Sequence, residues 1–143
     1  MPSPFEFRLR PAVRRRLDQL GQEFQAEFLG RKARRAPDSV EVLVALARVL
    51  MDLGRNEESL AVHRRLAALI PRNPIIHYNL ACSQAICQLP EEATASLHTA
   101  IEFGYDDVEF MQRDDDLASL RGTPAFEALA GELTHRNDET PSN

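Results

Sequence analysis

The stretch VEVLVALARVLMDLGRNEESLAVHRRLAALIPRN (residues 40–73) is followed directly by PIIHYNLACSQAICQLPEEATASLHTAIEFGYDD (residues 74–107), and together they decide the fold. Aligned without a gap, they carry the same residue types at a constant offset of 34 residues. The matched pairs are Leu46 with Leu80, Ala47 with Ala81, Glu57 with Glu91, Glu58 with Glu92, and Ala61 with Ala95. A fixed period of this length indicates stacked structural units, each of which buries its apolar face against the next.

The first unit has the pattern of two helices. Asp38 and Glu41 have the spacing of a capping box, so we expect Asp38 to cap the first helix. Gly54 supplies the left-handed residue that ends this helix, and a second helix begins near Asn56 and ends at Pro71. Between the cap and Gly54, apolar residues follow a three-to-four spacing: Val42, Leu43, Leu46, Val49, Leu50 and Leu53.

The second unit repeats the same signals. Asn73 is the expected cap, and Pro74 takes the first helical position. Pro90 opens the next helix, where Glu91 and Glu92 are favoured by the partial positive charge of the helix N-terminus. This helix closes at Gly104. Because the connections are only three or four residues long, each helix pair is expected to be antiparallel.

At this point the sequence resembles the tetratricopeptide repeat family, whose unit is also about 34 residues long. The residues that carry the resemblance are Leu43, Leu46, Ala47, Ser59, His63, Leu66 and Pro71 in the first unit, and His77, Leu80, Ala81, Ala93, Leu97, Ala100 and Tyr105 in the second. Leu66 stands where alanine is usual, and Tyr105 where proline is usual. The resemblance implies an all-α fold, in which antiparallel helix pairs stack as a short right-handed superhelix of about six to seven helices.

The segment after the repeats is similar to the capping tail of bacterial repeat proteins of this family. We expect Asp114, Asp115 and Asp116 to cap a short helix, and Thr123-Pro124 to begin a last helix. Such a cap would cover the apolar face that a terminal repeat exposes. The predicted organisation is a repeat domain over residues 37–135, formed by 40–73, 74–107 and the cap 108–135, and then a disordered tail over 136–143. The apolar residues of the cap are Leu117, Leu120, Phe126, Leu129 and Leu133.

Residues 1–36 form a basic N-terminal segment with its own helical pattern. Its apolar residues follow a continuous three-to-four spacing: Leu9, Val13, Leu17, Leu20, Phe24 and Phe28. The pattern fits one long helix, or a degenerate helix pair that breaks at Gly21. The segment holds nine of the 17 basic residues and four acidic residues, whereas the whole chain carries a net charge of −5. This asymmetry fits a solvated helix face or docking on the acidic remainder of the chain. Nucleic acid is the less favoured partner, since no aromatic residues are interleaved for base stacking.

Composition indicates an ordinary globular chain of 143 residues with 43% hydrophobic and 27% charged residues. No apolar run has the roughly 20 residues that cross a bilayer, and Glu6, Arg8 and Arg10 interrupt the place of a signal peptide. Cys82 and Cys87 lie on different sides of one predicted helix, beyond disulfide reach. We therefore expect a cytoplasmic protein, and sixteen arginines against one lysine fit a bacterial source.

The reactive side chains of the second unit are expected to serve packing. His77 and Cys82 point about 140° apart on a helix, so a zinc site is disfavoured, and the expectation is no metal and no cofactor. The glutamate pairs recur at the start of a helix in both units. A catalytic pair would not be expected twice, so a role at the helix N-terminus explains them. The sequence also lacks the glycine-rich phosphate loop, the nucleophile elbow and the zinc-protease motif. We expect no enzymatic activity.

The resemblance implies instead a concave groove lined by the first helix of each repeat. Carried onto this chain, the candidate peptide-binding residues are Val44, Arg48, Met51, Ile75, Tyr78, Asn79, Cys82 and Arg113. This mixture suits a peptide with apolar anchors and one acidic group. The expected function is a non-enzymatic adaptor that binds a segment of another protein. The alternative is a secretion-type chaperone or a self-dimerising assembly module that uses the N-terminal helix.

Overall fold

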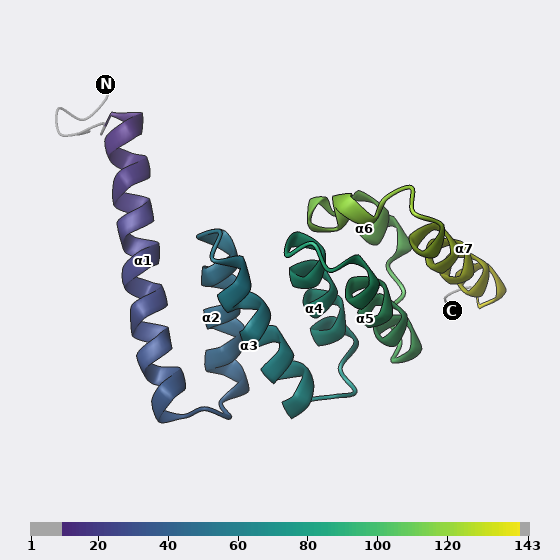
Figure 1. Cartoon of the computed structure of the whole chain (residues 1–143), viewed down its shortest axis with the longest axis horizontal. Coiled ribbons are helices and arrows are strands. Elements are labelled where there is room, and N and C mark those ends of the chain that lie inside the picture. Colours follow the sequence, from purple (N-terminus) through teal and green to yellow (C-terminus); the bar gives the residue numbers. More distant parts are fainter. Residues whose placement is uncertain (1–9, 141–143) are drawn as a thin grey trace, which may run out of the picture.

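The structure is a computed structural model that describes residues 10–140, and every regular element in this range is a helix (Figure 1). The elements are α1 (Pro11–Arg35), α2 (Val40–Asp52), α3 (Asn56–Leu69), α4 (Pro74–Ile86), α5 (Pro90–Glu102), α6 (Val108–Arg113), the 3-10 helix η1 (Asp115–Leu120) and α7 (Pro124–Glu139). Each helix from α1 to α4 packs against the next in the chain, and α5 packs against α4, η1 and α7. The predicted all-α, repeat-like fold is confirmed.

The two predicted repeat units are the helix pairs α2–α3 and α4–α5. Asn73 caps α4, because its Oδ1 accepts hydrogen bonds from the backbone N–H groups of Ile75 and Ile76 at 3.0 and 3.1 Å. Gly54 and Gly104 end α2 and α5 with φ values of +69° and +109°, which are left-handed conformations that favour glycine. These signals act locally, and the structure confirms the boundaries that they predicted.

The cap of α2 differs from the prediction. Ser39, and not Asp38, is the N-cap residue, and its side chain accepts from the backbone N–H of Val42 at 3.5 Å. The carboxylate of Asp38 accepts from Arg65 of α3 at 2.7 Å. The prediction was therefore wrong by one residue: Asp38 lies in the connection before α2, where its carboxylate pairs with Arg65.

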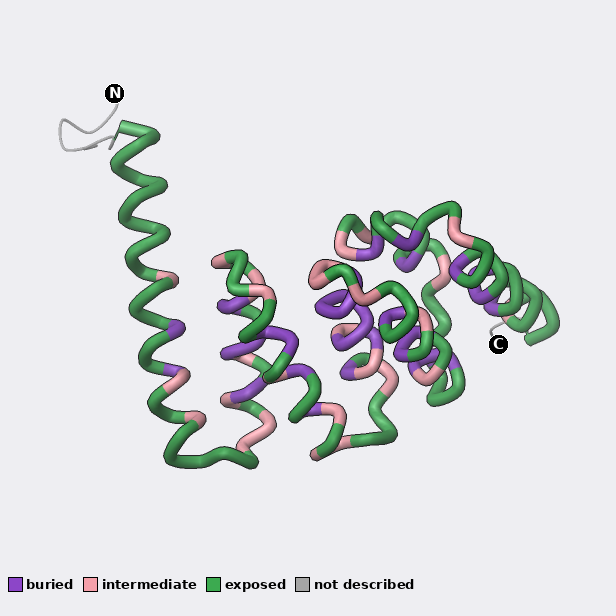
Figure 2. The backbone as a smooth tube through the Cα atoms, viewed as in Figure 1, coloured by how far each residue is buried: buried purple, intermediate pink, exposed green. Residues whose placement is uncertain are grey.

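Helix α1 is continuous from Pro11 to Arg35, so of the two open alternatives the structure adopts one long helix without a break at Gly21. Ala26, Leu29 and Ala33 in its second half pack against α2. Residues 10–21 are all exposed, and this half of α1 extends beyond its neighbours (Figure 2). The predicted apolar position Leu9 lies outside the described residues.

Small side chains sit where the helices approach most closely. Ala81 of α4 and Ala93 and Ala100 of α5 are completely buried. They belong to the largest apolar cluster, which continues from α4 and α5 into α6, η1 and α7. Because a larger side chain would push two helices apart, the predicted requirement for small residues at these positions has a direct steric basis.

The C-terminal cap is built as predicted for residues 108–135. Asp114 caps η1 through the backbone N–H of Asp116 at 3.0 Å, and Thr123 caps α7. The apolar cap residues are all buried: Leu117, Leu120, Phe126, Leu129 and Leu133. Helix α7 continues to Glu139, so the prediction of a disordered tail is wrong for residues 136–139, and residues 141–143 lie outside the described range.

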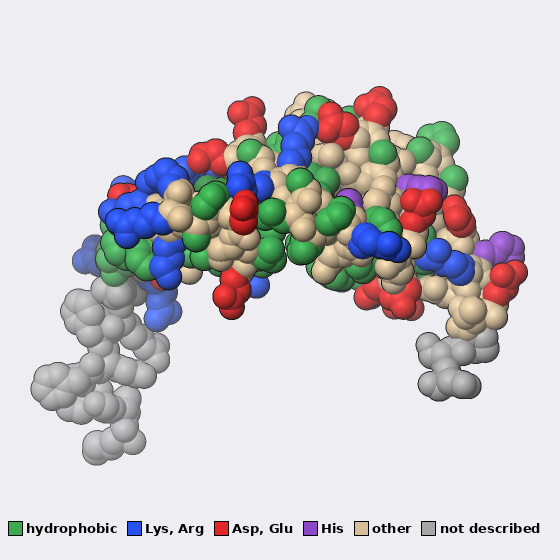
Figure 3. Space-filling view, turned by 90° about the horizontal axis from the view of Figure 1, so that it is seen from below, with side chains coloured by type: hydrophobic (Ala, Val, Ile, Leu, Met, Phe, Trp, Pro, Cys, Tyr) green, Lys and Arg blue, Asp and Glu red, His purple; other side chains and the backbone are tan. Residues whose placement is uncertain are grey.

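Charge is distributed unevenly over the molecule. Figure 3 shows Lys and Arg side chains gathered at the end formed by α1, whereas Asp and Glu are spread over the rest of this face. Among the helices of residues 10–140, none is both long enough and apolar enough to cross a membrane.

Candidate functional site

A pocket of about 320 Å³ opens between α2, α3 and α4, and it brings four of the predicted groove residues together. Val44, Arg48 and Met51 follow one another at helical spacing on one side of α2, and Asn79 faces them from α4. Val44 and Arg48 are exposed, and Met51 and Asn79 are half-buried. Asp52, which is exposed, also lines the pocket. The pocket therefore offers two apolar side chains, one cation, one carboxylate and one amide to a ligand.

The base of this pocket contains the buried His63. Leu66 and Ile76 line the same base with apolar surface. The Nδ1 atom of His63 is hydrogen-bonded to Oγ of Ser83 at 2.7 Å, and Oγ of Ser59 lies 3.4 Å from the same nitrogen. Burial lowers the pKa of His63 to about 4, so the ring is neutral at physiological pH. The hydrogen bond between His63 and Ser83 joins α3 to α4. It could not be predicted from the sequence, where the repeat pattern assigned His63 only a packing role.

Two further predicted residues lie outside the pocket. Ile75 is 54% exposed and stands one helical turn before Asn79 on α4. Arg113 belongs to α6, where its guanidinium forms an exposed ion pair with Glu109 at 3.5 Å. The structure does not group Arg113 with the residues of α2.

The prediction that Tyr78 and Cys82 line an open groove is wrong, because the C-terminal cap covers both. Tyr78 is only 4% exposed, and its hydroxyl donates to Oδ2 of Asp114 at 2.7 Å. Its ring stacks on Tyr105 with centroids 4.4 Å apart and lies 6.0 Å from the ring of Phe110. Cys82 is 3% exposed. The cap thus occupies the part of α4 that carries Tyr78 and Cys82.

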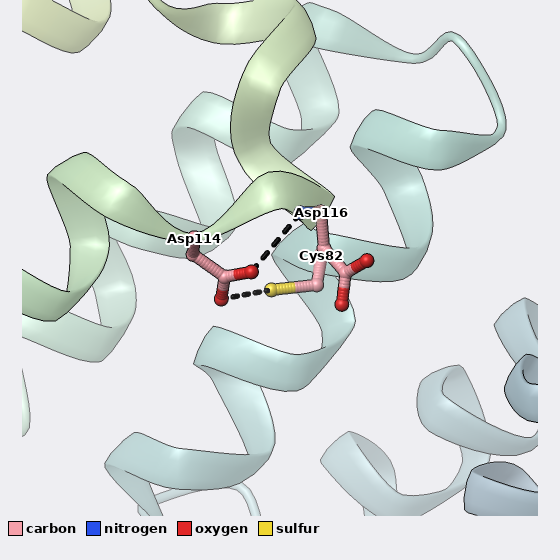
Figure 4. Close-up of side chains that lie close together, drawn as sticks. All are labelled: Cys82, Asp114 and Asp116. Carbon is pink, nitrogen blue, oxygen red and sulfur yellow. Dashed lines mark hydrogen bonds between the residues drawn. The ribbon is translucent and has the colours of Figure 1, made fainter.

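Cys82, Asp114 and Asp116 form the tightest group of metal-ligating types in the described part of the chain, with ligand atoms within 4.8 Å of one another. Figure 4 shows the side chains of Cys82 and Asp114 pointing toward each other. The thiol donates to Asp114 at 3.8 Å, and the same carboxylate accepts from Tyr78 and from the backbone of Asp116.

The electrostatic surroundings of the Cys82 thiol favour its protonated form, which donates a hydrogen bond to Asp114. Burial, followed by the charges of Asp114 and Asp116, raises the pKa of the Cys82 thiol well above its usual range. Since metal binding and nucleophilic attack both need the thiolate, the environment opposes both. His77, the other residue considered for zinc, is hydrogen-bonded through Nε2 to the carbonyl oxygen of Pro71 at 2.7 Å. The group therefore ties the cap to α4.

The repeated glutamate pairs lie in the first turns of α3 and α5, as predicted. Glu58 forms an ion pair with Arg55 at 2.6 Å, and Glu92 forms one with Arg64 at 2.8 Å. Each pair therefore contains one glutamate that is held by an arginine. This arrangement fits a structural role at helix starts.

Sequence reasoning missed a hollow of about 770 Å³ that lies between α1, α2 and α3. Leu43, Leu46 and Leu50 of α2 line it, on a different side of the helix from Val44 and Arg48. The charged residues around it are Glu23, Glu27 and Arg34 of α1, Glu58 and Arg65 of α3, and Arg55 just before α3. Its presence depends on how far α1 stands from α3. No local sequence signal reports that distance.

Comparison with known proteins gives no relative from which a role could be transferred. No protein-family model matches the chain, and no curated protein matches it.

Proposed function

We propose that this protein is a non-enzymatic interaction module of tetratricopeptide type, which binds a segment of a partner protein against α2 and α4. The observation that carries the proposal is the pocket shared by Val44, Arg48, Met51 and Asn79. Repeat architectures present extended surfaces of this kind to partners. The 34-residue period and the helix boundaries support the same reading.

The chemistry of the pocket describes the segment that would fit. Met51 adapts its shape to an apolar side chain, and Val44 extends the apolar surface at the pocket edge. Arg48 offers a guanidinium for a carboxylate, and the Asn79 amide can hydrogen-bond a peptide group. Ile75, exposed next along α4, extends the apolar surface. The proposed ligand is a short peptide with one or two apolar anchors beside an acidic residue.

Two observations adjust the site that the sequence suggested. Tyr78 and Cys82 are buried under the cap, so they are not part of the proposed site. Both cysteines are free thiols, which fits the proposed setting in a reducing cytoplasm. The proposed site therefore consists of Val44, Arg48, Met51, Ile75 and Asn79.

Selection from a displayed random-peptide library against the full chain tests the proposal. We expect selected peptides to share an acidic residue next to apolar residues. Val44→Glu and Arg48→Glu should each weaken binding of these peptides by at least about tenfold in fluorescence anisotropy, because a like charge then faces the peptide carboxylate. Ala95→Glu is the matched control, since it adds the same charge at an exposed position on α5. Peptides that bind all three variants equally well would place the interaction elsewhere.

A further inference from the structure

The outer face of α1 carries an apolar stripe, defined as Val13, Leu17, Leu20, Phe24 and Phe28. These are five of the nine large hydrophobic residues that remain exposed among the described residues, with exposed fractions between 44% and 66%. At about 100° per residue, the stripe lies on the opposite side of α1 from Ala26, Leu29 and Ala33, which pack on α2. It therefore faces away from the repeats.

An apolar face at this place is unusual for a repeat protein. The terminal element of such a chain ordinarily presents a polar outer surface, because no further unit covers it. Here the C-terminal end follows that rule with a buried cap, whereas the N-terminal end presents the stripe. Contiguous exposed apolar surface marks an interaction site.

We infer that the stripe is the interface with a second copy of this chain, and that the two α1 helices pack antiparallel. The stripe has a centre of symmetry between Leu20 and Gly21. Reversal about that centre places Val13 opposite Phe28 of the second copy and Leu17 opposite Phe24. Two copies of one surface can therefore cover each other completely, as a two-fold axis requires. Gly21 lies at the centre, where the absence of a side chain lets the two helices approach closely.

The charges beside the stripe fit the same arrangement. Arg16, Glu23 and Glu27 lie along one edge of the stripe, and in an antiparallel pair the same edges of the two helices meet. Arg16 of one copy then falls between Glu23 and Glu27 of the other, within about 3 Å of each along the axis. Two-fold symmetry repeats this contact, so two arginines and four glutamates meet along one edge of the interface. Glu27 is also within 3.7 Å of Arg31 on its own helix.

A parallel pair of α1 helices lacks this net attraction. In register, Arg16 of one copy would lie between Arg14 and Asp18 of the other, so repulsion and attraction would offset each other there. The antiparallel pair sets Arg10 opposite Arg31 at each end of the stripe, and it gains two carboxylates beside each Arg16. The contacts of Arg16 therefore favour a second copy as the occupant of the stripe and the antiparallel direction. The inference is independent of the proposed peptide site, which lies beyond α2 from the stripe.

Sedimentation equilibrium of the full chain tests the stoichiometry. We expect the wild-type protein to sediment at twice the mass of one chain. Leu17→Glu should raise the dimer dissociation constant by at least about 100-fold, because it places two unpaired charges in an apolar contact. Phe110→Glu is the matched control on α6, where Phe110 is exposed to a similar extent. A wild-type chain that stays monomeric at about 100 μM, roughly 100-fold above a dissociation constant of about 1 μM, would overturn the inference.

Charge exchange tests the pairing. Arg16→Glu alone should weaken the dimer by about tenfold, and the triple variant with Glu23→Arg and Glu27→Arg should restore it. Circular dichroism of each variant would show that α1 is still helical. A triple variant as weak as Arg16→Glu would contradict the proposed pairing.

Cross-linking tests the direction. In a background with Cys82→Ala and Cys87→Ser, Leu17→Cys and Phe24→Cys chains are oxidised separately and as a mixture. The antiparallel pair predicts a cross-linked product of one Leu17→Cys chain with one Phe24→Cys chain, identified by mass spectrometry, because these positions face each other. Efficient cross-linking of each variant to itself would instead show parallel helices.

Discussion

Buried polar residues couple neighbouring helices, within each repeat and between the two repeats, through a few specific contacts. Ser59 donates to the carbonyl oxygen of Ala47 at 3.0 Å, and His63 bonds to Ser83 of the next repeat at 2.7 Å. Ser96 donates to Oε1 of Gln84 at 2.7 Å in the following helix pair. Because an unpaired polar group is costly inside a protein, these contacts fix the register of neighbouring helices as well as their distance.

His63 predicts a specific dependence of stability on pH. Its pKa in the folded protein is lowered to about 4, whereas an unfolded chain has the ordinary value near 6.5. Below pH 6.5 the unfolded chain therefore binds a proton that the folded protein does not bind. The contribution of the neutral His63 ring to the free energy of unfolding is therefore fully present above pH 6.5, and it is lost as the pH falls toward 4. The expected loss from this residue is about 2 kcal/mol between pH 7 and pH 5.

Urea unfolding at both pH values, for the wild type and for His63→Gln, measures this contribution. The variant lacks the titrating ring, so its stability should change by about 2 kcal/mol less over the same interval. Equal pH dependence in the two proteins would mean that His63 titrates normally in the fold.

At the scale of helices, the cap is attached to α4 mainly through Asp114. This residue accepts from Tyr78, Cys82 and the backbone of Asp116, so it joins α4 to η1 and also begins η1. The aromatic stack of Tyr78 and Tyr105 lies beside it. The hydroxyl of Tyr105 is the one fully buried side-chain polar atom without a hydrogen bond within residues 10–140. Burial raises the pKa of Tyr105 to about 12, so the group stays neutral there.

Asp114→Ala should destabilise the protein by about 2–3 kcal/mol, since it removes a helix cap and leaves the Tyr78 hydroxyl without its acceptor. Asp115→Ala is the matched control, because the Asp115 side chain is fully exposed and should matter by less than about 0.5 kcal/mol. Thermal unfolding with Tyr78→Phe as the second arm of a double-mutant cycle separates the two effects. If the losses of unfolding free energy caused by Tyr78→Phe and Asp114→Ala simply add in the double variant, the hydrogen bond between the two side chains contributes no interaction energy.

The helix boundaries could be predicted because their signals act over a few residues. Asn73 and Gly54 set the backbone next to them, and the repeat period fixes which residues face the core. The groove was predicted only in part. Val44, Arg48, Met51 and Asn79 do share a pocket, since helical spacing alone brings the first three together.

The remaining site residues could not be placed from sequence, for reasons of long-range packing. Tyr78 and Cys82 are covered by residues more than thirty positions away, and no local pattern reports where a cap will dock. The cap was predicted to exist, but its Asp114 was expected only to start a helix. The exposed stripe on α1 was visible as a periodicity, and only the position of α2 shows which side of α1 stays open.

At the scale of the whole molecule, the chain is an array in which each helix mainly contacts its neighbours. Helices α4 and α5 have packed elements on both sides, whereas the first half of α1 has none in the single chain. In such an array stability is a sum of local and nearest-neighbour terms. Protection from amide exchange should therefore be highest in α4 and α5, and in the dissociated chain it should be lowest in the first half of α1.

Ala93→Glu tests this linear coupling. Ala93 is completely buried between α5 and its neighbours, so a glutamate there should cost about 3–5 kcal/mol through steric conflict and a buried charge. Hydrogen exchange followed by mass spectrometry should show protection lost in α4, α5 and the cap, while α2 and α3 keep part of theirs. Ala95→Glu, on the exposed side of the same helix, should leave the pattern unchanged. A uniform loss of protection from α2 to α7 would mean that the chain unfolds as one unit. An unchanged melting temperature would contradict the repeat phase, because that phase places Ala93 against α4.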